Sequence, residues 1–162
     1  MLRNDIVRAI ANKLEATILG DAAGSTTQPA GLFYDADTAT LTYAGTVAME
    51  EELEENNVYN NLTYIVSPEI KSTLRTTSKD EGSGIFVMEN GEINGLPVFS
   101  TSACAGIVVG DFREYVIAQW GAIDLVVDPY TQAANGKVRL VINAYFDAKP
   151  RRSNAFVAKV AE

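Results

Sequence analysis

The sequence predicts an α+β fold, in which helices fill the first half of the chain and strands fill the second. Between residues 4 and 19, apolar residues recur every four positions, which is the spacing of one helix face. From residue 84 onward, Asn-Gly pairs separate short apolar runs, and residues 137–147 alternate between apolar and polar. Because strands do not alternate regularly with helices, a doubly wound parallel sheet is not expected.

The first helix is expected over residues 4–19. Asn4 would cap its first turn, and Gly20 would end it in the left-handed conformation. The apolar stripe of this helix consists of Ile6, Ile10, Leu14 and Ile18.

A loop and a second helix are expected next. Residues 20–38 are rich in Gly, Ala, Ser and Thr, and Pro29 and Gly31 mark a turn within them. The second helix, over residues 46–56, would be capped by Thr46 and would carry a block of glutamates.

The remaining elements are one short helix and a series of strands. A strand at Leu62–Val66 leads into a helix with Ser67 at its cap and Pro68 in its first turn. Asn90-Gly91 and Asn94-Gly95 predict two tight hairpin turns. Further strands, expected to pair antiparallel, are Gly106–Gly110, Tyr115–Gln119, Ile123–Asp128, Lys137–Asp147 and Ala155–Val160.

The composition argues against several classes of function. The chain has 162 residues, a net charge of −8, no histidine and one cysteine, Cys104. The acidic balance disfavours a dedicated nucleic-acid-binding protein, and the lack of histidine removes the commonest general base and zinc ligand. A single cysteine cannot form an intrachain disulfide. No apolar run is long enough for a transmembrane helix, so no membrane partner is expected.

Charge is distributed unevenly along the chain. Residues 49–55 contain five glutamates and no basic residue, whereas six Lys or Arg residues follow position 136. Such blocks form either solvated faces or complementary contacts between copies of a chain.

No group of residues makes a convincing catalytic or ligand site. Asp111, Asp124 and Asp128 are far apart in sequence and are expected to be solvated turn residues. Cys104 has no neighbour that would activate its thiol. Trp120 and the tyrosines would form the best candidate ligand pocket, although aromatic residues on strands more often belong to a core or an interface. We therefore expect no catalytic residue, no cofactor and no metal.

Five segments, in this order, carry a resemblance to a known family. Residues 11–33 contain a helix and a glycine-rich connection, and residues 64–75 contain a strand and a helix. Gly95–Val98 and Gly110–Phe112 with Tyr115 precede a final match at Asn154–Val157. Together these segments resemble the carboxy-terminal part of tailed-bacteriophage major capsid proteins of the Hong Kong 97 type, including the spine helix and the start of the axial lobe.

The resemblance implies a structural shell protein, without enzymatic activity, that self-assembles into a phage head around DNA. The implied axial lobe comprises residues 46–119 and 154–162, and the peripheral lobe with the spine helix comprises residues 1–45 and 120–153. The segment from Gly110 to Tyr130 would carry the chain between the lobes, with Tyr115, Ile117 and Trp120 held by the sheet.

Contacts between subunits are expected in the glutamate block, in the loop at residues 128–136 and in the basic C-terminal segment. The expected contact residues are Glu50, Glu51, Glu54, Tyr130, Asn135, Arg151 and Arg152. Expected partners are other copies of the chain, full-length capsid subunits, a portal or scaffold protein, and packaged DNA through non-specific contacts. The expected location is the virion capsid, and the bacterial cytoplasm during expression.

The sequence shows no counterpart of two family segments that precede the spine helix, the N-terminal arm and the extended loop. The chain is therefore expected to be a truncated or partial form that remains a monomer or small oligomer and does not close a shell. Two alternatives stay open: the shell protein of a bacterial nanocompartment, and a small-molecule or carbohydrate-binding module that uses Trp120 and the tyrosines. An enzyme is third, because no nucleophile and base are paired.

Overall fold

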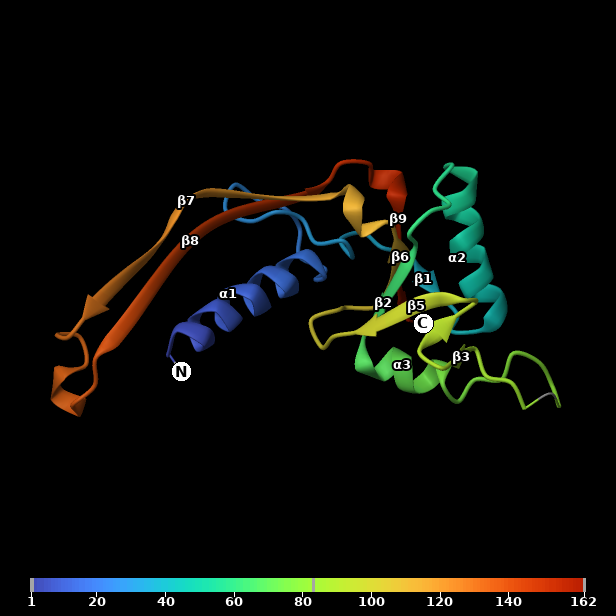
Figure 1. Cartoon of the computed structure of the whole chain (residues 1–162), viewed down its shortest axis with the longest axis horizontal. Helices are drawn as coiled ribbons and strands as arrows, with labels where there is room; N and C mark the ends of the chain where they lie inside the picture. The colour runs from blue at the N-terminus through green and yellow to red at the C-terminus, as the bar shows by residue number, and fades with distance from the viewer. Residues whose placement is uncertain (1, 83, 162) are drawn as a thin grey trace.

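The computed structural model describes residues 2–82 and 84–161, and it has two parts (Figure 1). One part is a seven-stranded sheet with two helices, α2 (Tyr43–Glu55) and α3 (Pro68–Leu74). The other is a long two-stranded ribbon that projects away from the sheet, with helix α1 (Leu2–Ile18) beside it. The predicted α+β class is confirmed.

The sheet is mixed. The strands after residue 84 that were expected to pair antiparallel do so with one another, and each parallel pair includes an earlier strand. Its order is β1 (Thr38–Ala39), β9 (Phe156–Ala161), β6 (Ile107–Gly110), β2 (Thr63–Val66), β5 (Leu96–Ser100), β4 (Glu92–Ile93) and β3 (Met88–Glu89). The β2–β5 and β1–β9 pairs are parallel, and the other pairs are antiparallel. A parallel pair needs a crossover connection, and α3 lies in the connection between β2 and β5.

Strand β6 is buried on both faces because the sheet has a different cover on each side. Ile107 and Val109 belong to a core cluster with Leu53 of α2 and Leu74 of α3. Val108 belongs to a second cluster on the opposite face, together with Leu19, Phe33 and Cys104. The expected buried strand at residues 106–110 is confirmed, because all four residues of β6 are buried.

Two predicted helix caps are wrong. Helix α2 begins at Tyr43, and the Thr42 side chain accepts a hydrogen bond from the Gly45 N–H at 3.2 Å. Thr46 lies one turn inside the helix, where its hydroxyl donates to the Tyr43 carbonyl at 2.8 Å. Asn4 likewise lies within α1 and not at its cap. The Ser67 cap of α3 is confirmed, since its side chain accepts from the Ile70 N–H at 3.2 Å.

Gly20 follows α1 but does not adopt the expected left-handed conformation. Its carbonyl instead accepts a hydrogen bond from the Phe33 N–H at 3.1 Å, and a side chain at Gly31 would overlap that same carbonyl. The Leu32 N–H also donates to the Ile18 carbonyl at 2.8 Å. The loop therefore folds back on the end of α1, and a glycine at position 31 allows the two backbones to approach.

Both Asn-Gly hairpin turns are confirmed. Asn90 and Gly91 have φ angles of 53° and 85°, and Asn94 and Gly95 have φ angles of 53° and 82°. Two successive positive φ angles characterise the turn that matches the twist of a tight hairpin. The first turn joins β3 to β4, and the second joins β4 to β5.

The ribbon consists of β7 (Tyr115–Asp128) and β8 (Arg139–Pro150), which pair antiparallel. The two strands expected at residues 115–119 and 123–128 are one strand with an irregularity between Trp120 and Asp124, where Gly121 has a φ angle of 70°. The side chains of Ile142, Ala144 and Phe146 face the groove that the ribbon forms with Ile10 and Leu14 of α1. The predicted apolar faces of α1 and β8 thus lie against each other.

Cys104 is buried in the second core cluster, and burial raises the pKa of its thiol from 9.0 to about 11. Its S–H donates to the Gly106 carbonyl at 3.2 Å.

We expect Cys104 to resist thiol reagents in the folded chain. A pKa rise of this size lowers the thiolate fraction at pH 8 about 100-fold, and only the thiolate is reactive. Labelling with a maleimide, followed by mass spectrometry, should therefore be at least about 100-fold slower than in urea-unfolded protein. Equal rates for native and unfolded chain would contradict the buried position.

Candidate subunit contact surface

Glu50, an expected subunit contact, is already bound within the chain. One of its carboxylate oxygens accepts hydrogen bonds from the Tyr64 hydroxyl at 2.7 Å and from the Asn94 side-chain amide at 2.9 Å. The Tyr64 hydroxyl also lies 3.2 Å from the Thr46 carbonyl. Burial, followed by the hydrogen bond and charge of Glu50, raises the pKa of Tyr64 well above its usual range. The carboxylate therefore joins α2 to the sheet and to the β4–β5 turn.

The other glutamates of α2 differ in their surroundings. Glu51 and Glu54 are exposed and point away from the core. Glu52 lies 3.4 Å from the Lys159 ammonium, which also lies 3.4 Å from Asp37. Part of the acidic block thus pairs with the basic C-terminal segment inside one chain, whereas Glu51, Glu54 and Glu55 remain on the surface.

Arg151 and Arg152 lie at the junction between the ribbon and the sheet. The Arg151 N–H donates to the Glu114 carbonyl at 2.7 Å, and its guanidinium lies 4.0 Å from the Glu114 carboxylate. The Arg152 guanidinium donates to the Asn56 carbonyl at 3.4 Å. Both side chains are largely exposed, so these contacts leave charge available at the surface.

The tip of the ribbon presents Tyr130, whose residue exposure is 85%. The Asp128 carboxylate organises this tip by accepting from the N–H groups of Tyr130 at 2.9 Å and Thr131 at 3.1 Å, and from the Thr131 hydroxyl. These hydrogen bonds, with that of the Thr131 hydroxyl the largest cause, lower the pKa of Asp128. Asn135 is exposed in the short 3-10 helix (Ala133–Asn135) of the same loop.

The largest set of exposed apolar side chains lies along the ribbon, and sequence reasoning missed it. Trp120 is 56% exposed and Ile117 is 50% exposed, so the β7–β8 pair holds their backbones but does not cover their side chains. Tyr115 is half-buried against the Phe156 ring. The further exposed apolar residues of the ribbon are Val116, Ile123, Leu125, Val126, Val127 and Tyr145, and Val138 is exposed just before β8.

The two faces of the ribbon have different neighbours. Cross-strand partners share a face, so Leu125 lies with Ile142 on the side toward α1. Successive residues of a strand point to opposite faces. The pairs Trp120–Tyr145 and Val126–Val141 therefore lie on the other side of the ribbon, away from α1, which we call the outer face. The sequence contained one sign that both faces of this strand carry apolar side chains. Residues 123–127 do not alternate between apolar and polar, as a strand with one buried face would.

The described residues contain no group of three acidic, cysteine or histidine side chains that would hold a metal ion. Asp111 accepts a hydrogen bond from the Arg113 N–H at 3.0 Å and caps a short 3-10 helix (Phe112–Glu114), so it acts as a turn residue. Across the same residues, no helix is both long and apolar enough to cross a bilayer.

The comparisons of this chain with known proteins agree with one another. Residues 1–160 match the phage capsid family. The major capsid protein of Halomonas phage phiHAP-1 is 30% identical over 165 residues, which cover 96% of this chain but only 27% of that protein. Among solved structures, Gordonia phage Cozz aligns with a TM-score of 0.70, 16% identity and coverage of 98% of this chain and 62% of the other. The capsid of an empty GTA particle aligns with a TM-score of 0.68, 16% identity and coverage of 99% and 64%.

The fold is therefore that of a phage capsid protein of the Hong Kong 97 type. The chain belongs to the phage capsid family, and it spans about a quarter of the length of the curated relative that it matches.

We expect Glu50→Ala to lower the free energy of unfolding by about 2 kcal/mol, because the mutation leaves the buried Tyr64 hydroxyl and Asn94 amide without their shared acceptor. Glu51→Ala and Glu54→Ala are matched controls on the exposed face and should change it by less than about 0.5 kcal/mol. Urea unfolding followed by circular dichroism measures all three. Equal effects at the three positions would show that the Glu50 contacts do not stabilise the fold.

Proposed function

We propose that the chain is a shell-forming part of the major capsid protein of a tailed bacteriophage or prophage, which self-assembles into the head around DNA. The observation that carries this proposal is the outer face of the ribbon. An isolated two-stranded ribbon is at best marginally stable in water, and this one leaves Trp120 and Tyr145 exposed side by side in register. Contact with neighbouring subunits would cover these side chains.

We assign the seven-stranded sheet with α2 and α3 to an axial lobe, and the ribbon with α1 to a peripheral lobe. The division expected after residue 119 falls within β7, so we count the peripheral lobe from Tyr115, where the ribbon begins. We also count β1 and the start of α2, which were expected in the peripheral lobe, with the sheet, because β1 pairs with β9. Support for this division is that each part has its own elements and the ribbon leaves the sheet as a unit (Figure 1).

All seven expected contact residues remain proposals. Tyr130 at the ribbon tip has the strongest support, because an ordered, exposed aromatic side chain is the typical anchor of an interface. Glu51, Glu54 and Asn135 are also exposed. Glu50 has weaker support, because its carboxylate is engaged within the chain.

A non-enzymatic role follows from the same proposal. The family is one of structural shell proteins, and we expect contacts with DNA to be non-specific because the net charge of −8 repels phosphate. The family match favours a phage shell over a nanocompartment shell. A ligand-binding module gains no support from Trp120, which lies on the open ribbon and does not line the groove between the ribbon and α1.

We expect the double variant Trp120→Ser, Tyr145→Ser to weaken self-association at least about 10-fold, because loss of two exposed aromatic anchors costs more than about 1.4 kcal/mol. The melting temperature should change little, since both side chains are largely exposed in the single chain. Sedimentation equilibrium over a concentration series measures the association constant.

Tyr59→Ser is the matched control, because Tyr59 is an aromatic residue of similar exposure outside the ribbon. Undiminished association of the double variant would show that the outer face of the ribbon is not a subunit contact.

A further inference from the structure

The outer edge of β9 is open over most of its length. Its neighbour on that side, β1, has only two residues, which pair with Val160 and Ala161. On the other side, β6 pairs with β9 from Phe156 to Lys159. The outer edge from Phe156 to Lys159 therefore has no strand beside it in the described structure.

The direction of the unpaired backbone groups follows from the ladder. The Val160 N–H donates to the Asp37 carbonyl at 2.9 Å, on the side of β1. Alternate residues of a strand direct their N–H and C=O groups to the same side, so those of Ala158 also point outward. The Phe156 N–H is used by the Ser153 carbonyl, but its own carbonyl points outward as well. No hydrogen bond from the described residues reaches the Ala158 N–H, the Ala158 carbonyl or the Phe156 carbonyl.

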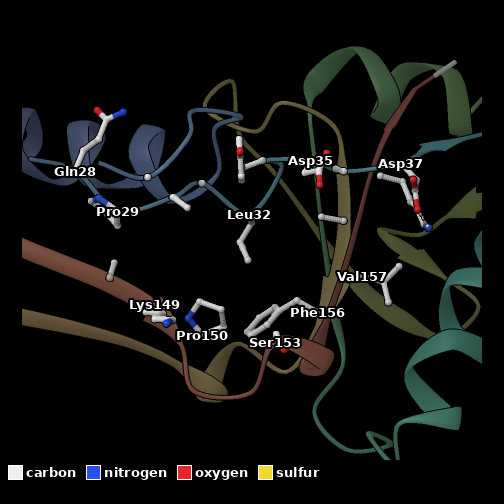
Figure 2. Close-up of a pocket in the computed structure, with 18 of the residues that line it drawn as sticks. Gln28, Pro29, Leu32, Asp35, Asp37, Lys149, Pro150, Ser153, Phe156 and Val157 are labelled. Atoms are coloured by element: carbon white, nitrogen blue, oxygen red, sulfur yellow. Dashed lines mark hydrogen bonds and ion pairs between the residues drawn. The ribbon is translucent and has the colours of Figure 1, made fainter. Parts of the chain in front are cut away.

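This edge borders a groove of about 680 Å³ (Figure 2). One wall is the loop that contains Pro29, Leu32 and Asp35, and the facing wall is the end of β8 at Lys149 and Pro150. The floor includes residues 156–159 of β9. A concave slot thus runs along a row of unpaired backbone donors and acceptors.

We infer that this groove accepts an extended segment of a second capsid subunit, which adds to the seven-stranded sheet as a strand beside β9. Only an extended backbone supplies acceptors and donors at the spacing of the Ala158 N–H, the Ala158 carbonyl and the Phe156 carbonyl. The open edge is about 13 Å long at 3.3 Å per residue, which fits a strand of about four residues. An exposed edge of this kind is a template for pairing with another chain.

The charges of the groove limit the segment further. Four carboxylates line it, those of Asp35, Asp37, Glu52 and Asp147, against the two ammonium groups of Lys149 and Lys159. Lys159 is shared by Asp37 and Glu52. An uncharged or basic segment therefore fits better than an acidic one. The inference depends on the proposed function, because the second subunit is available only if the chain assembles.

Hydrogen–deuterium exchange, read at single amides by NMR or electron-transfer fragmentation, tests the inference on the wild-type chain. The Ala158 amide should exchange at least about 10-fold more slowly in concentrated, associated protein than in dilute protein. The Val157 and Lys159 amides, which face β6, should be protected in both states. Unchanged exchange at Ala158 on association would overturn strand addition.

An Ala158→Pro variant provides a second, independent test of strand addition. Proline removes the outward N–H and leaves the β6 ladder intact, and edge strands tolerate it where the N–H faces outward. Ala158→Ser is the control, because it keeps the N–H at similar size. We expect the proline variant to associate at least about 10-fold more weakly than the serine variant, with both folded by circular dichroism.

The outcomes separate the two proposals. A wild-type chain that stays monomeric at all concentrations contradicts both proposed contacts, the outer face of the ribbon and the strand addition. Association of folded Ala158→Pro with wild-type affinity contradicts strand addition alone. If the proline variant does not fold, exchange at the wild-type Ala158 amide decides the question.

Discussion

The packing of the Phe156 ring against Phe112 and Tyr115 holds the ribbon on the sheet. The ring centroids lie 5.3 Å and 5.7 Å apart, in edge-to-face geometry. Phe156 is the first residue of β9, Phe112 precedes the ribbon and Tyr115 begins it, so one aromatic cluster fixes the point where β7 leaves the sheet. The Arg151 N–H, bound to the Glu114 carbonyl at 2.7 Å, fixes the return of β8 at the same place.

The exposed surface of the ribbon follows from that junction. Because both strands are anchored at one end, they project from the sheet and cannot fold back to bury their side chains on it (Figure 1). Helix α1 covers part of one face, where Ile142 and Phe146 lie toward Ile10 and Leu14. The outer face stays exposed in the single chain, and in the proposed shell it would be covered by neighbouring subunits. The fold thus separates a buried core from an arm whose apolar surface is exposed.

The sequence predicted features whose cause is local. Ser67 with Pro68 marked a helix start, and the Asn-Gly pairs marked two turns, because the residues involved determine the backbone within a few positions. The predicted cap of α2 was wrong because Thr42 and Thr46 are both suitable capping residues and lie one turn apart. Thr42 caps the helix, and Thr46 is buried in the core. The partners of Glu50 come from β2 and from the β4–β5 turn, more than ten residues away, and no pattern in the glutamate block reports them.

The candidate contact surface was predicted only in part for the same reason. Tyr130 and Asn135 were expected from a turn-rich loop, and the structure places them in an exposed tip. The exposure of Trp120 and Tyr145 depends on whether another layer packs on the outer face of the ribbon. A helix or a second sheet on that face would bury the same sequence, and the family resemblance predicted the two lobes but not which side chains stay exposed.

Hydroxyl-radical footprinting with mass spectrometry tests most directly whether neighbouring subunits cover the ribbon. Oxidation of Trp120, Tyr130 and Tyr145 would be compared in dilute and in associated protein, with Tyr59, which lies outside the ribbon, as the internal reference. The account predicts that association protects the three ribbon residues several-fold relative to Tyr59. Equal oxidation of the ribbon in both states, with the protein clearly associated, would contradict it.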